Sequence, residues 1–264
     1  MADSDRGAVT TTKLPVLFQA HGAPPLLDDA GWMRELADWA AALPRPRAVV
    51  VVSAHWEAAP LSIGAVRPVP LIYDFYGFPA RFYELAYPAP GAPDVAQRIR
   101  ELTRAAGHPV VDAPERGLDH GAYIPLMAMY PAADVPVLQI SLPSEDPREL
   151  FALGRVLAPL RDEGVLLIGS GFLTHNLRAP RAPEPPAWAR DFDAWIADVL
   201  ARGDHDALID YRAKAPGVRE ALPTHEHFAP VLVSVGAAPD AAVTFPITGY
   251  WWNGSLTRRS VQLT

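Results

Sequence analysis

Residues 48–57 read AVVVVSAHWE, and this stretch decides the fold class. Four consecutive valines followed by two small residues are typical of a strand that is buried on both faces, as the parallel strands of α/β proteins are. His55 stands near the carboxyl end of this stretch. Functional side chains of open α/β sheets gather beyond the carboxyl ends of the strands, so we expect His55 to be one of them.

Two further apolar stretches run into a histidine in the same way. Residues 14–22 read LPVLFQAHG and reach His21, and residues 164–175 read GVLLIGSGFLTH and reach His175. Because the carboxyl ends of parallel strands meet at one edge of a sheet, the sequence predicts that these histidines converge there.

The rest of the chain alternates predicted strands with predicted helices. We expect strands at residues 14–20, 48–54, 110–111, 135–142 and 165–169, and one or two closing strands within 243–263. We expect helices at residues 26–43, 93–106, 124–130, 147–161, 187–202 and 204–215, and a short one at 230–236. This alternation predicts an α/β protein, a three-layer α/β/α sandwich around a central, largely parallel but mixed sheet. We expect one catalytic domain over residues 13–264, behind a flexible tail at 1–12.

The composition excludes several classes of protein. The formal charge of −7 argues against a nucleic-acid partner and against a polybasic membrane patch. The absence of cysteine excludes disulfides, Cys-ligated zinc and thiol nucleophiles. We find no apolar signal region at the N-terminus and no apolar run near the roughly 20 residues that span a bilayer, so we expect a cytoplasmic protein without a membrane partner. The sequence predicts no oligomeric state.

The chain has eight histidines, and a divalent metal would need them as ligands because no thiols are present. We expect His21 and His55 to point into one crevice and to bind such a metal. A third ligand would come from residues 224–230, THEHFAP. Residues two apart face opposite ways on an extended segment, so His225 and His227 are not expected to bind the same ion. Glu226 is the carboxylate alternative and would give a site of two histidines and one carboxylate.

Glycine-rich turns surround the remaining candidates. His120 and His175 lie in such turns and could act as an acid or a base. The sequence Gly169-Ser170-Gly171 could be a phosphate loop, but no Gly-Lys-Ser/Thr follows it. It also lacks the pattern of a hydrolase nucleophile, which has glycine two positions on either side of the serine.

Seven motifs together resemble one family. They are QAHGAP at 19–24, VSAHWE at 52–57, YDFYGFP at 73–79, LAYPAPG at 85–91, RGLDHG at 116–121, GSG at 169–171 with THN at 174–176, and PTHEHF at 223–228. In this order they resemble the class III extradiol ring-cleaving dioxygenases of the LigB type, in particular the branch similar to DOPA 4,5-dioxygenase. The resemblance covers the chain from about residue 14 to 236.

The resemblance implies an Fe(II) centre held by His21, His55 and His227. It implies that His175 is the acid/base histidine and that His120 lies near the substrate and O2. The substrate would be a DOPA-like or other substituted catechol, or an aminophenol. Three neutral imidazoles leave such a site more positive than one that contains a carboxylate, which favours a dianionic catecholate.

Two other functions remain open at this point. Three histidines also suit a catalytic zinc with one bound water, so a zinc-dependent hydrolase is the alternative, and Zn(II) could replace Fe(II) in a purified protein. A third possibility is a binding protein that keeps the fold without turnover.

Several positions depart from the family's pattern. Leu222 stands where a histidine is frequent, and Phe172 and Leu173 stand where a small residue is usual. The segment 248–255, TGYWWNGS, is also bulky. We expect these residues in the wall of the substrate pocket, where they would alter the choice of substrate.

Overall fold

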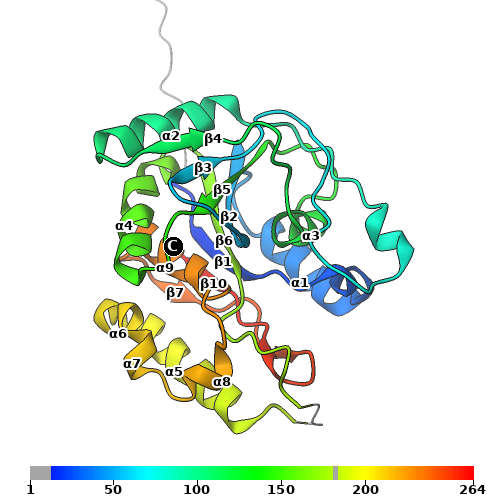
Figure 1. Cartoon of the computed structure of the whole chain (residues 1–264), viewed down its shortest axis with the longest axis vertical. Helices are drawn as coiled ribbons and strands as arrows, with labels where there is room; N and C mark the ends of the chain where they lie inside the picture. The colour runs from blue at the N-terminus through cyan, green and yellow to red at the C-terminus, as the bar shows by residue number, and fades with distance from the viewer. Residues whose placement is uncertain (1–12, 181–183) are drawn as a thin grey trace, which may run out of the picture.

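The computed structural model describes residues 13–180 and 184–264. Its core is an eight-stranded sheet in the order β4-β3-β5-β2-β6-β1-β10-β7 (Figure 1). The strands are β1 (Val16–Ala20), β2 (Ala48–Glu57), β3 (Leu61–Ile63), β4 (Val110–Asp112), β5 (Val137–Leu142), β6 (Val165–Gly171), β7 (Val243–Thr244) and β10 (Val261–Leu263). The expected tail at residues 1–12 lies outside the described part of the chain.

The four central strands β5, β2, β6 and β1 are parallel to one another. At both sides the sheet becomes mixed, because β3 is antiparallel to β5, and β10 is antiparallel to β1 and β7. The valines of β2 are buried, which the run of four valines predicts for a strand covered on both faces. The predicted α/β sandwich with a mixed sheet is confirmed.

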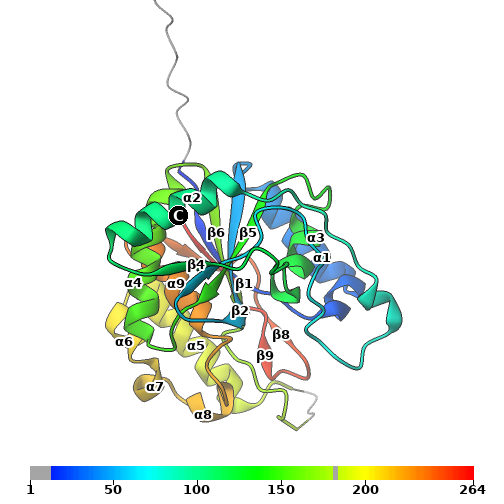
Figure 2. The ribbon, with the colours of Figure 1, turned by 45° about the horizontal axis from the view of Figure 1, so that its top comes forward.

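Helices cover both faces of the sheet (Figures 1 and 2). One face carries α1 (Ala30–Ala41) and α3 (His120–Met129), whose buried side chains form one apolar cluster. The other face carries α2 (Pro93–Ala105), α4 (Pro147–Leu157), α5 (Ala187–Arg202) and α9 (Ala229–Ala237), which build the second. Smaller elements are α6 (His205–Ile209), α7 (Tyr211–Lys214), α8 (Val218–Ala221), the hairpin of β8 (Tyr250–Trp251) and β9 (Leu256–Thr257), and the 3-10 helices Pro24–Asp28, Ala80–Tyr83 and Ala158–Arg161. Within the described ranges, no helix combines the length and the apolar character needed to cross a membrane.

Several boundaries differ from the predicted ones, and each difference has a local cause. Helix α3 begins at His120 and not at 124, because the Asp119 side chain accepts a hydrogen bond from Ala122 N and so caps the helix. Strand β2 continues through His55 to Glu57. The helix predicted at 204–215 is two short helices, and β3 and α8 were not predicted.

Helices α4 and α9 pack with their backbones in close approach. A Cβ atom on Gly154 of α4 would lie 2.2 Å from the Val233 carbonyl oxygen and 2.7 Å from Ala237 N. Every residue of α9 is buried, so the helix cannot move outward without opening the core. Glycine at 154 is therefore required by this contact.

We expect Gly154→Ala to lower the free energy of unfolding by about 1–3 kcal/mol, the usual cost of overpacking a core. The added methyl group would meet backbone atoms of α9, which cannot rotate away as a side chain can. Urea unfolding at neutral pH measures the change. Ala152→Ser on the exposed face of the same helix is the control, and it should stay within about 0.5 kcal/mol of wild type. Equal stabilities for the two variants would contradict the packing argument.

Candidate functional site

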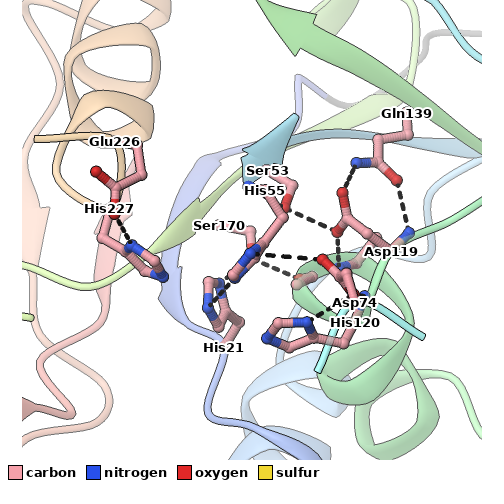
Figure 3. A network of polar contacts seen from close by, with 12 residues as sticks. His21, Ser53, His55, Asp74, Asp119, His120, Gln139, Ser170, Glu226 and His227 are labelled. Carbon is pink, nitrogen blue, oxygen red and sulfur yellow. Dashed lines mark hydrogen bonds and ion pairs between the residues drawn. The ribbon is translucent and has the colours of Figure 1, made fainter. Parts of the chain in front are cut away.

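Three histidines from separate elements meet at the carboxyl edge of the sheet. His21 directly follows β1, His55 lies near the end of β2, and His227 precedes α9. One ring nitrogen of each lies within 4.8 Å of the others, and Nε2 of His21 is 3.2 Å from Nε2 of His55 (Figure 3). The structure therefore brings together the three residues that the resemblance implies as metal ligands.

The far nitrogen, Nδ1, of each ring has an oxygen partner. His227 Nδ1 lies 2.8 Å from Glu226 Oε1, and His55 Nδ1 lies 3.5 Å from Asp74 Oδ2. His21 Nδ1 lies 3.1 Å from Ser170 Oγ. These oxygen partners hold a proton on Nδ1 and turn Nε2 of each ring toward the cluster, as carboxylates and other groups behind metal-bound imidazoles do.

The tautomer of His21 follows from its partner. The Ser170 hydroxyl donates its single proton to the Gly121 carbonyl oxygen. Its oxygen can therefore only accept from the imidazole, so Nδ1 of His21 carries the proton and Nε2 carries a lone pair.

The three imidazoles are uncharged at neutral pH. Burial lowers the pKa of His55 to about 3, helped by the neighbouring His120 and opposed by the Asp74 carboxylate. Burial, followed by repulsion from the other histidines, also holds the pKa of His21 and of His227 well below the usual value.

Uncharged rings with inward Nε2 atoms present three acceptors to one another and no proton between them. Two acceptors at 3.2 Å, such as Nε2 of His21 and of His55, repel each other unless a cation lies between them. The donor set therefore fits a divalent metal ion that favours imidazole nitrogen.

His120 and His175 border this cluster. The His120 ring centre lies 4.0 Å from that of His55, and the His175 ring is stacked on His227 at 3.5 Å. Burial lowers the pKa of His175 to about 4, although the Glu226 carboxylate opposes the shift. His175 thus borders the cluster where the resemblance implies an acid/base histidine, and His120 borders it where the resemblance implies a residue near the substrate and O2.

The C-terminal hairpin positions His175. The Thr174 hydroxyl donates to Ser255 O and accepts from Thr257 N, at 3.2 and 2.9 Å. His175 itself forms an isolated bridge with Leu256. Strands β7 and β10 extend the main sheet, whereas β8 and β9 form a separate two-stranded sheet that fixes the backbone next to a candidate catalytic residue.

A buried polar network joins the end of β2 to the start of α3. Asp119 is fully buried and accepts hydrogen bonds from the Ser53 hydroxyl at 2.8 Å and from the Gln139 amide. The Ser53 oxygen in turn accepts from His55 N at 3.2 Å. Since Asp119 also caps the helix that begins with His120, one network fixes both histidines.

The alternatives for the third ligand lie elsewhere. The His225 ring packs 5.5 Å from Tyr211 and is not grouped with the cluster. Glu226 accepts hydrogen bonds from His227 Nδ1 and from the Thr224 hydroxyl, so its carboxylate lies behind the cluster. Two overlapping groups could also hold a metal ion: His55, Asp74 and His120; and His175, Glu226 and His227.

The glycines that flank Ser170 have a packing role. A Cβ atom on Gly171 would lie 2.0 Å from the His227 carbonyl oxygen, which accepts a hydrogen bond from Phe172 N at 2.9 Å. This close approach brings the loop with His227 onto the end of β6. The structure gives Gly169-Ser170-Gly171 neither a phosphate nor a nucleophile role; it places His21 and His227.

Phe172, Leu173 and Leu222, which we expected together in the pocket wall, lie in different surroundings. Phe172 packs edge-on against His21 at 5.1 Å and lies beside His175. Leu173 and Leu222 are 0% and 1% exposed and belong to the core cluster of α5 and α9. The Phe172 ring thus packs against three of the histidines, His21, His175 and His227.

Sequence reasoning missed the groups that hold the imidazoles. Asp74 and Asp119 each lie within a motif that carried the family resemblance, but no role was predicted for either. Their partners His120 and Gln139 are 46 and 20 residues away, a separation that no local pattern reveals.

The fold and the site together define a class of protein. It is an α/β sandwich whose candidate active site is a cluster of histidines, at the carboxyl edge of the sheet, that could hold a metal ion. Residues 11–255 match the family described as "Catalytic LigB subunit of aromatic ring-opening dioxygenase". The chain belongs to this LigB family.

Proteins of similar sequence match nearly the whole length of this chain. A protein of Beta vulgaris named "4,5-DOPA dioxygenase extradiol" is 41% identical over 94% of this chain and 95% of its own length. A protein of Escherichia coli (strain K12) with the same name is 39% identical over 97% of this chain and 96% of its own. The crystal structure of an uncharacterized protein from Escherichia coli K12 superposes with a TM-score of 0.79, at 36% identity, over 95% of this chain and 100% of that one.

The buried histidines predict a loss of stability in acid. Near pH 7, His175 is neutral in the folded and in the unfolded chain. Below about pH 6.5 the unfolded chain binds a proton there, whereas the folded ring does not until its pKa of about 4 is approached. Between pH 7 and 5 this single histidine should cost about 2 kcal/mol of unfolding free energy.

Urea unfolding of the metal-free protein at both pH values measures this cost. His175→Gln should reduce the difference between pH 7 and 5 by about the same 2 kcal/mol. His108→Gln changes an exposed histidine and serves as the control. A pH dependence that is unchanged in His175→Gln would contradict the assignment of a buried, neutral ring.

Proposed function

We propose that this protein is an extradiol dioxygenase that uses Fe(II) and O2 to open the ring of a catechol-type substrate, which is DOPA-like or another substituted catechol or an aminophenol. The observation that carries the proposal is the set of three neutral imidazoles with inward Nε2 atoms, in a chain of the LigB family. The names of the Beta vulgaris and Escherichia coli relatives support the extradiol assignment.

His21, His55 and His227 would hold the metal. Bound Fe(II) would supply electron exchange between an aromatic diolate and O2, chemistry that a closed-shell side chain lacks. Three protein ligands leave open positions for the substrate and O2. The oxygen partners of the Nδ1 atoms keep the three rings oriented before any ligand arrives.

His175 would remove a proton from the substrate hydroxyl. Its ring is neutral at pH 7 because burial lowers its pKa to about 4, so it has a lone pair available. Stacking on His227 holds it beside the cluster, and the negative Glu226 stabilises the protonated ring. The same ring can later return the proton, which is the role of a general acid/base.

His120 would contact the substrate or O2 from another side. It borders the cluster at His55, whereas His175 borders it at His227. Its Nδ1 lies 2.8 Å from Asp74 Oδ1, so Nε2 is the ring nitrogen left free to contact the substrate or O2.

The zinc-dependent hydrolase remains the alternative outcome of the test. Three histidines and one water are a common catalytic zinc site, and the same residues would hold it. The two functions differ in what they consume: one requires O2 and a reduced metal, the other only water.

Anaerobic reconstitution with Fe(II), followed by O2 uptake on a panel of catechols and aminophenols, tests the proposal. We expect consumption of O2 and incorporation of both atoms of isotopically labelled O2 into the product. His175→Ala should lower kcat by about 10²–10⁴-fold, as loss of a general acid/base does, without lowering the iron content.

A matched pair of variants tests the third ligand. His227→Ala should abolish stoichiometric iron binding, whereas His225→Ala, two residues away and outside the cluster, should retain it. Iron content after gel filtration is the measurement. Iron-loaded protein that consumes no O2 with any substrate, while zinc-loaded protein hydrolyses an ester in a His227-dependent way, would replace the dioxygenase by the hydrolase.

A further inference from the structure

Asp74 lies between two histidines with different proposed roles. Its Oδ1 atom lies 2.8 Å from His120 Nδ1 and also accepts from His120 N at 3.1 Å. Its Oδ2 atom is buried and lies 3.5 Å from His55 Nδ1 (Figure 3). One carboxylate thus faces a proposed metal ligand, His55, with one oxygen and a histidine proposed to contact the substrate or O2, His120, with the other.

The loop that carries Asp74 is fastened on both sides of it. Ile72 N donates to Leu118 O at 2.9 Å, and the Tyr73 hydroxyl donates to Leu85 O at 2.7 Å. Phe75 is 6% exposed and packs against the His120 ring at 5.8 Å. The carboxylate is therefore held in place by its own neighbours, not by the histidines alone.

The proton positions follow from the chemistry of the carboxylate. An ionised carboxylate only accepts hydrogen bonds, so both imidazoles must present an Nδ1 proton to it. Among the described residues, Oδ2 has no hydrogen-bond partner, and His55 Nδ1 is the group positioned to supply one. The Nδ1–H of each ring is then directed at Asp74, and Nε2 is the nitrogen on the side that borders the cluster.

We propose that Asp74 is a positioning residue that fixes the Nδ1–H tautomer of His55 and of His120 at once. One side chain, carried on the 72–79 loop, then orients both the metal ligand His55 and the substrate-contacting His120. The roles of the two histidines rest on the proposed function, but the tautomers do not.

Asp74→Asn separates this role from a simple loss of charge. An amide offers one accepting oxygen and one donating NH2 group, so it can satisfy only one of the two Nδ1–H groups. Glu226→Gln removes the same charge behind His227, but its amide oxygen can still accept from that single ring. The two variants are thus matched in charge and differ in the number of imidazoles that they serve.

Zinc binding and NMR are the measurements, and neither requires turnover. We expect Asp74→Asn to raise the Kd for Zn(II) by about 10–100-fold, the usual effect of losing a group behind a metal ligand, and Glu226→Gln to raise it by clearly less. Long-range proton–nitrogen spectra of the metal-free protein should show Nδ1–H at His55 and His120 in wild type and its loss from one of them in Asp74→Asn. Tyr76→Ala, on the same loop and 89% exposed, is the control for general damage to the loop and should leave both readouts unchanged.

Several results would overturn the proposal. One is a Kd in Asp74→Asn that rises no more than in Glu226→Gln, and another is retention of both Nδ1 protons in Asp74→Asn. If Asp74→Asn does not fold, the wild-type spectrum decides alone, because an Nδ1 without a proton on His55 or on His120 contradicts the proposal. A failure of the catechol panel would leave these results intact, so the two proposals fail separately.

Discussion

A buried imidazole must place each of its nitrogens, and this constraint shapes the site more than any other. Each ring of the cluster can present a lone pair inward only if its outer nitrogen gives its proton to an oxygen. Ser170, Asp74 and Glu226 provide those oxygens for His21, His55 and His227, respectively. In this arrangement the Nε2 lone pairs face one another and repel, and a bound cation would remove that repulsion. The site therefore fits a bound cation, because its three Nε2 atoms repel one another without one.

The same constraint explains how the backbone is packed around the rings. The oxygen partners act over distances near 3 Å, so the strands and loops that carry them must hold their positions within a fraction of that. The network of Asp119, Ser53 and Gln139 ties the end of β2 to the start of α3. On the other side, Gly171 lets the His227 carbonyl oxygen approach β6 closely. A substitution in the Asp119 network or at Gly171 would shift a histidine ring of the site. The packing of the core therefore controls the geometry of the cluster.

The sequence predicted those parts of the fold that have a local signature. Strands such as residues 48–57 are visible because burial on both faces leaves a continuous apolar run. Strand β3 has three residues within a proline-rich loop and offers no periodicity to detect. The start of α3 was missed because its cap, Asp119, lies among residues typical of a turn. The histidines could be proposed from motifs, whereas the contact of Asp74 with His120 joins residues far apart in the chain and needed the structure.

The charges behind the rings alter the expected preference for substrate. Three neutral imidazoles alone would leave a divalent ion with its full charge, which favours a dianionic catecholate. The structure adds the carboxylates of Asp74 and Glu226 immediately behind two of the rings, and together they balance such an ion. A substrate that lost both hydroxyl protons to solvent would then give the buried site an excess of negative charge. The protons are better kept within the site, and the neutral ring of His175 beside Glu226 is placed to hold one of them. In the proposed reaction, retention of a proton on His175 is thus favoured by the electrostatics of the site as well as by the need for an acid later on.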